Sequence, residues 1–303
     1  MAKKNQRLFS ASIGVMAYNE EKNIGRFLDS LLSQDDINKL IHEIIIVSSG
    51  STDKTNKITQ EYAKKYNKIK LIKQNKRNGK ASGVNTFIAN AKKDILILAS
   101  SDLILDKNTI KYLLAPLRKK EVGITGVHPI PVNNETTMMG YIAHLQWRLH
   151  HEIALRKPKM GEMIAFRKIF RQIPSISSVD EANIEPLIRG QGYKAVYCPK
   201  ALVYNKGPEN VAEFISRRRH IYFGHIVTKY EYGYEVSTLN GFMAFLMVFH
   251  FAHPSIRLFL FLPMAMLLET ISRFLGLLDY KFRLRSHTVW KVTPSTKNLS
   301  TIQ

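Results

Sequence analysis

A carboxylate follows an apolar segment at residues 95–99, where the chain reads Ile-Leu-Ile-Leu-Ala and then Ser100-Ser101-Asp102. Such a short apolar run is typical of a buried strand. An aspartate at the carboxyl edge of a parallel sheet can hold a divalent cation that bridges phosphate oxygens. The alternative is that Asp102 only caps a turn or the following helix.

Hydroxyl side chains follow a second apolar segment, residues 44–47 (Ile-Ile-Ile-Val). The next residues are Ser48, Ser49 and Gly50. Ligands of open parallel sheets bind outside the carboxyl ends of the strands, and glycine permits a tight turn or a close approach of ligand to backbone. An ordinary junction between a strand and a helix has the same pattern, so this turn alone does not establish a ligand site.

Two further segments carry groups suited to a phosphorylated substrate. Arg77 and Lys80 lie at the expected start of a helix, an arrangement that binds phosphate. Asp180 and Glu181 form an acidic pair, and a carboxylate suits the role of general base. The same acidic pair would also stabilise the amino end of a helix, without any role in catalysis.

Alternating strands and helices must position these groups. Strand-like segments occur near residues 12–17, 44–47, 69–72 and 95–99, and helical patterns fill the gaps between them. The first such helix has its apolar residues on one face: Ile24, Phe27, Leu28, Leu31 and Leu32. This alternation predicts βαβ units and an α/β fold with a sheet covered on both faces.

The ordered set of motifs resembles the large family of inverting, GT-A-fold glycosyltransferases often called family 2. The resemblance covers about residues 12–224. It implies a GT-A-type (Rossmann-like), mostly parallel sheet flanked by helices, and use of a nucleotide-diphospho-sugar as donor. The segments that carry it are AYNEEKNIG (17–25), VSSGSTDKT (47–55), RNGKASGVN (77–85), the strand ending at Asp102, GEMIAFR (161–167), SVDEANI (178–184) and SRRRHIYFG (216–224).

The resemblance implies a role for particular residues. Glu181 stands at the usual position of the catalytic base, and its neighbour Asp180 is a credible substitute. Asp102 is the implied ligand of Mg²⁺ or Mn²⁺. The implied contacts to the nucleotide-sugar come from Ala17, Tyr18, Glu20, Ser48, Ser49, Lys80, Ser101, Arg217 and Arg219.

The sequence departs from the family pattern at serines. The family usually has aspartate where Ser48 and Ser49 stand, and Asp-x-Asp where this chain has Ser100-Ser101-Asp102. Serine can hydrogen-bond a base or a metal-bound water, but it supplies no charge. The metal site therefore rests mainly on Asp102. The serines also motivate an alternative, a catalytically weakened member that binds a nucleotide-sugar or a partner without turnover.

Residues 236–303 differ in composition from the rest. From residue 236 to residue 268 the one formal charge is Arg257, and residues 242–251 and 258–268 are strongly apolar. Three structures are open for this region: interfacial or re-entrant helices, a kinked span or hairpin, or a buried helical pair. Phenylalanine-rich helices with flanking basic residues favour membrane contact. We expect a glycosyltransferase domain at residues 1–235 and a membrane-associated apolar and basic helical region at residues 236–303.

The net charge of +21 (45 Lys and Arg, 24 Asp and Glu) limits the classes of partner that the chain is expected to bind. It suits anionic membranes, phosphorylated substrates or nucleic acid. No nucleic-acid-binding motif is recognisable, so we do not expect nucleic acid as a partner. The polar, basic residues 1–7 do not resemble a secretory signal. We expect the cell membrane as location, a cytoplasmic catalytic domain, and a lipid-linked or polysaccharide acceptor.

Overall fold

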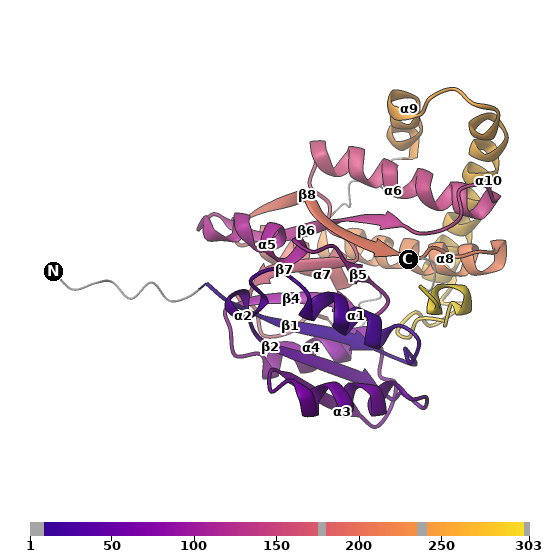
Figure 1. Cartoon of the computed structure of the whole chain (residues 1–303). Coiled ribbons are helices and arrows are strands. Elements are labelled where there is room, and N and C mark those ends of the chain that lie inside the picture. Colours follow the sequence, from indigo (N-terminus) through magenta and orange to yellow (C-terminus); the bar gives the residue numbers. More distant parts are fainter. Residues whose placement is uncertain (1–8, 175–179, 235–240, 300–303) are drawn as a thin grey trace.

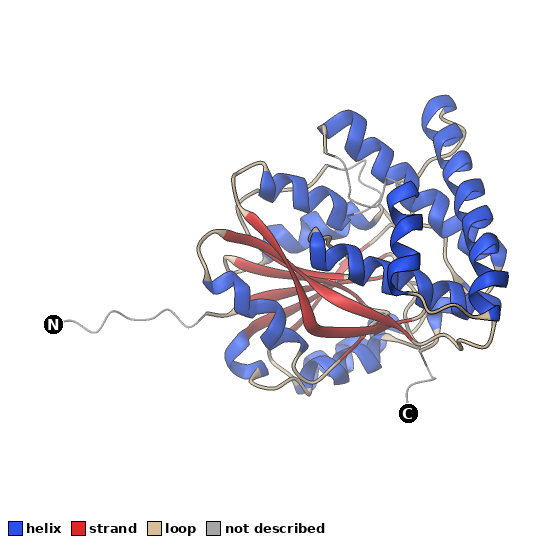
Figure 2. Cartoon of the chain, turned by 90° about the horizontal axis from the view of Figure 1, so that it is seen from above, coloured by secondary structure: helices blue, strands red, loops and turns tan. Residues whose placement is uncertain are grey.

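The computed structural model describes residues 9–174, 180–234 and 241–299. Within these ranges, eight strands form one sheet in the order β3-β2-β1-β4-β7-β6-β8-β5 (Figures 1 and 2). The strands are β1 (Ala11–Ala17), β2 (Ile41–Ser49), β3 (Ile69–Gln74), β4 (Ile95–Ser100), β5 (Ile104–Leu105), β6 (Val122–Pro131), β7 (Met163–Arg167) and β8 (Lys194–Asn205).

The strand directions put the expected motifs at one edge of the sheet. Strands β3, β2, β1 and β4 are mutually parallel neighbours, and β6 pairs in parallel with β8. Strand β7 runs antiparallel between β4 and β6, and β5 is antiparallel to β8. The carboxyl ends of β1, β2 and β4 therefore lie side by side, and they carry Tyr18, Ser49 and Asp102.

Helices cover both faces of the sheet, as predicted (Figure 2). In β2, Ile44 and Ile46 pack toward one face, and Ile45 and Val47 toward the other, because side chains alternate along a strand. The first face is covered by α1 (Ile24–Leu32), α3 (Thr55–Lys65) and α5 (Thr109–Leu114), and the second by α4 (Lys80–Asn90) and α7 (Asp180–Arg189). The expected α/β fold, with a mostly parallel sheet flanked by helices, is confirmed. Two short helical turns, α2 (Ile37–Leu40) and η1 (Ala115–Arg118), precede β2 and β6.

The remaining helices gather at one end of the sheet (Figure 1). They are α6 (Met138–Arg156), α8 (Val211–Tyr232), α9 (Gly241–Phe251) and α10 (Ile256–Phe282). Helix α10 packs closely on α8, where a Cβ at Gly276 would lie 2.9 Å from the backbone oxygen of Arg219. The predicted domain boundary at residue 235 lies outside the described residues.

After α10 the chain returns to the sheet. We call residues 283–299 the C-terminal tail; it contains the short helix η2 (Pro294–Lys297). Its end reaches the start of α1, where the amide of Leu299 donates to Oδ1 of Asn23 at 3.3 Å and Arg26 donates to Asn298 at 3.2 Å. The last residues described thus pack against the first βα unit.

Candidate active site

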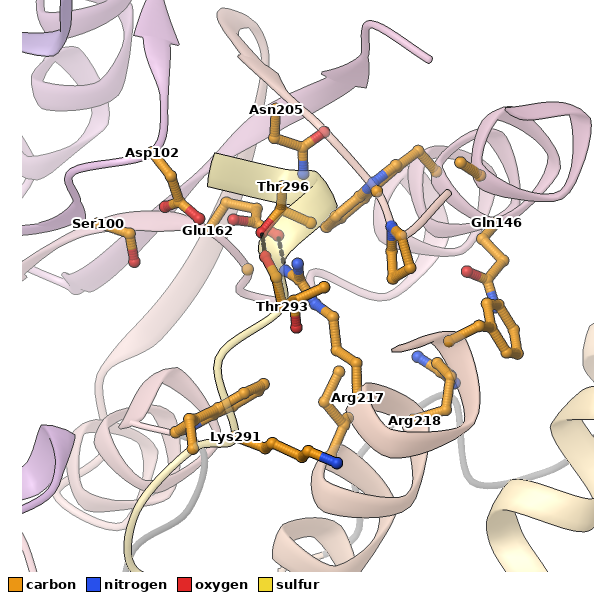
Figure 3. Close-up of a pocket in the computed structure, with 18 of the residues that line it drawn as sticks. Ser100, Asp102, Gln146, Glu162, Asn205, Arg217, Arg218, Lys291, Thr293 and Thr296 are labelled. Atoms are coloured by element: carbon orange, nitrogen blue, oxygen red, sulfur yellow. Dashed lines mark hydrogen bonds and ion pairs between the residues drawn. The ribbon is translucent and has the colours of Figure 1, made fainter. Parts of the chain in front are cut away.

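A cavity of about 680 Å³ lies at the carboxyl ends of β1, β2 and β4. It continues past β7 to α6, α8, α9 and α10, and the C-terminal tail forms one wall. Figure 3 shows Ser100 and Asp102 on one side of this space, Gln146 and Arg218 on the other, and Arg217 between them. We call the part around Tyr18, Ser49 and Asp102 the donor end.

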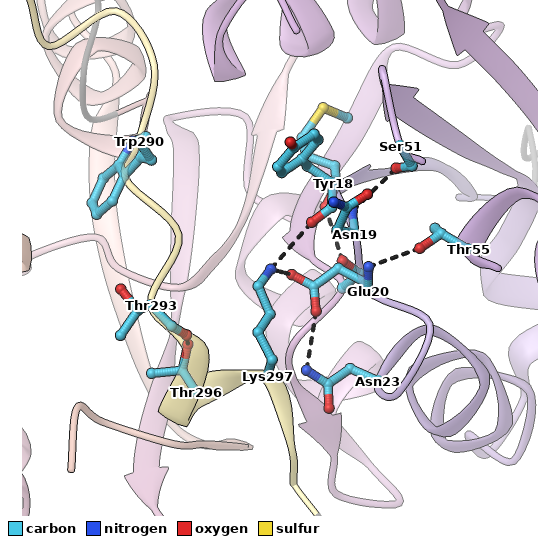
Figure 4. Close-up of polar contacts among 12 residues, drawn as sticks. Tyr18, Asn19, Glu20, Asn23, Ser51, Thr55, Trp290, Thr293, Thr296 and Lys297 are labelled. Carbon is cyan, nitrogen blue, oxygen red and sulfur yellow. Dashed lines mark hydrogen bonds and ion pairs between the residues drawn. The ribbon is translucent and has the colours of Figure 1, made fainter. Parts of the chain in front are cut away.

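Hydrogen bonds between two loops fix the donor end (Figure 4). Asn19 has a positive φ of 51°, its amide donates to Oγ of Ser51 at 3.1 Å, and its side-chain oxygen accepts from the amide of Thr52 at 2.9 Å. The amide of Glu20 donates to Oγ1 of Thr55 at 2.7 Å. Because the β1–α1 and β2–α3 loops brace each other, the side chains that project from them are held in place.

The two serines of the β2 turn differ in their surroundings. Oγ of Ser48 donates to Oγ of Ser51 at 2.9 Å, so this hydroxyl is used within the turn. Ser49 lines the cavity, and its Oγ has no hydrogen-bond partner among the described residues. A polar atom shielded from water and left without a partner is costly, so a ligand atom would be favourable here. Of the two serines, Ser49 is the one placed to contact a ligand.

Basic and aromatic groups face the same space across the start of α4. The Arg77 guanidinium lies 3.7 Å from the centre of the Tyr18 ring, and Lys80 lines the cavity at the first turn of α4. Arg77 also donates to the backbone oxygen of Trp290 at 2.6 Å. Gly79 has a φ of 85°, and a Cβ there would lie 2.3 Å from the backbone oxygen of Thr288, so the tail crosses directly over this helix start.

Two carboxylates converge at the donor end. Glu20 is buried, and Lys297 donates hydrogen bonds to its carboxylate and, at 3.2 Å, to the backbone oxygen of Tyr18 (Figure 4). Burial and the negative charge of Asp102 raise the pKa of Glu20 to about 7, although Lys297 opposes the shift. This place favours a cation, because Asp102 destabilises the ionised form of Glu20.

Residues 12–177 match the family model described as "Glycosyl transferase family 2". The chain belongs to glycosyl transferase family 2. Its curated relatives include a dolichyl-phosphate beta-glucosyltransferase of Homo sapiens, 29% identical over 142 residues that cover 45% of this chain and 41% of the relative. A poly-beta-1,6-N-acetyl-D-glucosamine synthase of Staphylococcus epidermidis is 26% identical over 145 residues, which cover 48% of this chain and 34% of the relative. The chain thus spans less than half the length of these two relatives.

Solved structures of the same fold extend further along the chain. The mannosyltransferase PcManGT from Pyrobaculum calidifontis, solved with GDP-Man and Mn²⁺, superposes with a TM-score of 0.63 over 91% of this chain and 88% of its own, at 20% identity. Glucosyl-3-phosphoglycerate synthase from Mycobacterium tuberculosis, solved with Mn²⁺ and UDP-glucose, gives a TM-score of 0.50 at 16% identity, over 73% of this chain and 78% of its own. At these identities the likeness establishes the fold alone.

The side chains of the cavity can bind a divalent cation only together with oxygen ligands from a substrate. In the described part of the chain, no group of three His, Cys, Asp or Glu side chains could hold a metal ion. Asp102 lines the cavity near Glu20, and Mg²⁺ and Mn²⁺ are commonly bound by one or two carboxylates together with substrate phosphates and water. Asp102 with a nucleotide diphosphate is therefore a chemically adequate donor set.

Three consecutive arginines on α8 diverge, because neighbouring helical residues point about 100° apart. Arg217 lines the cavity and pairs with Glu162 at 3.4 Å. Arg219 points elsewhere and forms an ion pair with Asp279 of α10. The structure thus places Arg217, but not Arg219, on the cavity wall.

The structure places most of the predicted site residues on the cavity wall, but not all of them. Lining the cavity are Ala17, Tyr18, Glu20, Ser49, Lys80, Ser101, Asp102 and Arg217. The hydroxyl of Ser101 is committed to the backbone oxygen of Met16 at 3.1 Å, and that of Ser48 to Ser51. Asp180 and Glu181 begin α7, but their side chains lie outside the described part of the chain. Glu185, one turn further along α7, does line the cavity.

Several cavity residues carry no local motif in the sequence. The tail contributes Trp290, Thr293, Thr296 and Lys297, and Lys159, Glu269 and Arg273 line the far side. They come from segments far from the βα loops in sequence. The one available signal was a cluster of small polar residues with a lysine, Thr293-Pro294-Ser295-Thr296-Lys297, which is also typical of an ordinary loop.

Proposed function

We propose that this chain transfers a hexosyl group, with inversion, from a nucleotide-diphospho-sugar to a lipid-linked or glycan acceptor. The observation that carries the proposal is the donor end, where Ser49, Lys80 and Asp102, which follow β2, β3 and β4 or end them, line one cavity. Family membership supplies the reaction class. The two curated relatives act on a lipid phosphate and on a polysaccharide by name, and the two solved neighbours were crystallised with nucleotide-sugars.

The donor end offers separate contacts for the parts of the donor. Ser49 can hydrogen-bond the base or ribose, and Tyr18 offers an aromatic face already packed against Arg77. The diphosphate can bind at Lys80 and the amino end of α4, because backbone N–H groups and the helix dipole favour negative charge there. Arg217 lies further along the cavity wall and can stabilise the charge that develops on the leaving diphosphate.

A divalent cation, Mg²⁺ or Mn²⁺, belongs to the proposal with Asp102 as its protein ligand. When bound, it would neutralise charge on the diphosphate leaving group. Glu20 lies close to Asp102 and adds negative charge there when it is ionised. Lys297 already supplies one positive charge at this place through its hydrogen bond to Glu20.

Inversion requires the acceptor to attack from the face opposite the leaving group. A hydroxyl oxygen of the acceptor forms a bond to the anomeric carbon while the bond to the diphosphate oxygen breaks. The hydroxyl proton passes to a carboxylate, and we assign this base role to Glu181, with Asp180 as the substitute. The support is the position of the pair at the start of α7, whose next turn brings Glu185 to the cavity.

We further propose that the enzyme acts at the cytoplasmic face of the cell membrane, with residues 236–303 as the membrane-associated region. Helix α10 is long and apolar enough to cross a bilayer by length and composition. One side of it packs on the catalytic domain from end to end: Leu258 in a cluster with Leu145 of α6, Leu268 in a cluster with Phe214 of α8, and Gly276 against α8. Such a helix is suited to lie on the membrane surface, because a span would need lipid around its middle turns.

A panel of UDP- and GDP-sugars, assayed for transfer and hydrolysis with and without Mn²⁺, tests the proposed activity. We expect turnover of at least one donor by the wild type and none by Asp102→Asn. Absence of both turnover and nucleotide-sugar binding would refute the proposal. Binding without turnover would instead favour a catalytically weakened family member.

A further inference from the structure

The cavity has a second end beyond Arg217, on the side away from Asp102 (Figure 3). We call it the inner chamber; its polar residues include His150, Lys159, Arg218, Glu269 and Arg273, with Glu185 and His225 beside them. We propose that the inner chamber binds the phosphate of a lipid-linked acceptor, with the lipid chain leaving along α10. This inference rests on the proposed function and deepens it by naming the chemistry that the acceptor must carry.

The inner chamber has more basic than acidic groups. Arg218 grips the Glu269 carboxylate through two hydrogen bonds of 2.7 Å, and Arg273 donates to it at 2.8 Å. Although burial disfavours the ionised form, the two arginines lower the pKa of Glu269 to about 2, so this group is a carboxylate at neutral pH. Lys159 lies in the same charged group, together with Glu185, so three basic side chains face two carboxylates.

The surroundings of Lys159 disfavour its charged form. Burial, and then the positive charge of Arg218, lower the pKa of its ammonium to about 7, against the weaker opposing effects of Glu185 and Glu269. Glu185 is itself paired with Arg189 at 2.8 Å. A bound anion would favour the protonated lysine, because opposite charge at close range stabilises the charged form.

His150 gives an independent indication of a ligand. The residue is 7% exposed and lines the cavity, and neither ring nitrogen has a hydrogen-bond partner among the described residues. Burial lowers its pKa well below the usual value, so the ring is neutral, with one N–H donor. Buried polar atoms are nearly always paired in folded proteins, and a phosphate oxygen would accept this N–H.

Apolar side chains surround the inner chamber on the side of α9 and α10. Leu145, Val248, Leu262 and Ala265 line it, and so do Met266 and Thr270, which are also exposed at the surface. The cavity therefore reaches the exterior on the apolar face of α10. An acceptor whose phosphate sits on the basic residues can pass its chain through this opening toward the membrane. A glycan acceptor without a lipid chain would gain little binding energy from these apolar side chains.

Farnesyl phosphate is a soluble probe that carries both required features. Calorimetry with the full chain should show that it binds about tenfold or more tightly than farnesol, which lacks the phosphate and so cannot accept charged hydrogen bonds. It should also bind more tightly than inorganic phosphate, which lacks the chain. Lys159→Met keeps the length of the side chain without its charge, and we expect it to weaken farnesyl phosphate binding about tenfold.

His150→Phe is the second variant, since it keeps the ring and removes both nitrogens. Lys111→Met, at an exposed lysine of α5 outside the cavity, is the matched control and should bind as the wild type does. UDP and GDP binding, followed separately, shows that each variant is folded and keeps its donor end. Equal binding of farnesyl phosphate and farnesol would overturn the inference, as would wild-type affinity in both Lys159→Met and His150→Phe. If the wild type binds neither UDP nor GDP, the result would count against the proposed function instead.

Discussion

Lys297 donates a hydrogen bond to the carboxylate of Glu20, a residue 277 positions earlier in the chain. The contact joins the C-terminal tail to the β1–α1 loop at the donor end of the cavity (Figure 4). Arg77 also donates to the backbone of Trp290, so hydrogen bonds at separate points along the tail hold it over this site. The tail is thus part of the candidate active site, although it follows the apolar helices in sequence.

Replacement of Lys297 should destabilise the fold, because the buried carboxylate of Glu20 would lose its hydrogen-bond donor. Lys297→Met leaves Glu20 in a buried position beside Asp102 without its cation, and we expect a loss of about 1–3 kcal/mol in the free energy of unfolding. Chemical denaturation measures the change. The double variant Glu20→Gln/Lys297→Met should recover part of the loss, because it buries no unpaired charge. Additive losses in the double variant would show that the two side chains do not interact.

Glu20 should also make stability depend on pH. Its pKa is raised from the usual 4.5 to about 7 in the folded chain, so the folded state binds more protons than the unfolded state between these values. This contribution to stability is complete below about pH 4.5 and is lost as the pH rises through 7. The difference in unfolding free energy between wild type and Glu20→Gln should fall across this interval and level off above it. A constant difference would mean that the Glu20 carboxyl titrates normally.

Residues near strand ends are the part of the site that the sequence predicts well. Ser49, Lys80 and Asp102 each follow or begin a regular element with a strong apolar pattern, and in a parallel sheet the strand ends must meet. The same local reasoning cannot tell Ser48 from Ser49 as a ligand contact. That difference depends on Ser51, whose hydroxyl accepts the hydrogen bond of Ser48.

Residues brought in by tertiary packing were beyond prediction from local patterns. Arg219 lies in a segment that resembles a family motif, but the carboxylate that binds it, Asp279, lies 60 positions away on α10. Lys159 and Lys297 are two of many lysines, and nothing in their neighbourhoods marks them. Their positions are set by how α8, α10 and the tail pack, which the period of a helix does not specify.

Ser100 offers a gain-of-function test of the metal site. Its side chain lies at the cavity together with Asp102 (Figure 3), so Ser100→Asp adds a second carboxylate where family 2 enzymes usually have Asp-x-Asp. We expect Mn²⁺ affinity in the presence of UDP or GDP to rise about tenfold, because ligand charge tunes affinity for hard cations. Calorimetric titration with Mn²⁺ measures this. Ser100→Asn, similar in size but uncharged, is the control; an equal gain in both variants would exclude a charge effect.

The base assignment predicts a loss of turnover without a loss of binding. Glu181→Gln should lower kcat by about 10²–10⁴, the usual contribution of a general base, and leave nucleotide affinity within about twofold. Steady-state kinetics and calorimetry together separate the two effects. Asp180→Asn should have the smaller effect on kcat. If Asp180→Asn carries the loss, the base is Asp180, and if neither variant is impaired, both assignments fail.

The exposed side of α10 predicts where the enzyme meets the membrane. Phe259 is 81% and Phe274 60% exposed, whereas both acids of α10, Glu269 and Asp279, are held by arginines of α8 on its other side. Because the exposed side is apolar and carries no acid, it suits an anionic lipid surface.

Phe259→Glu and Phe274→Glu should each weaken binding to vesicles that contain phosphatidylglycerol by about tenfold or more, since burial of one such side chain contributes roughly 1.5–3 kcal/mol. Flotation of the full chain with these vesicles measures the effect. Tyr66→Glu is the matched control, because Tyr66 is 43% exposed at the end of α3, outside α9 and α10. Unchanged flotation of both α10 variants would remove the membrane assignment. If the same substitutions instead dissociate a dimer in the absence of lipid, the exposed side of α10 binds a second copy of the chain.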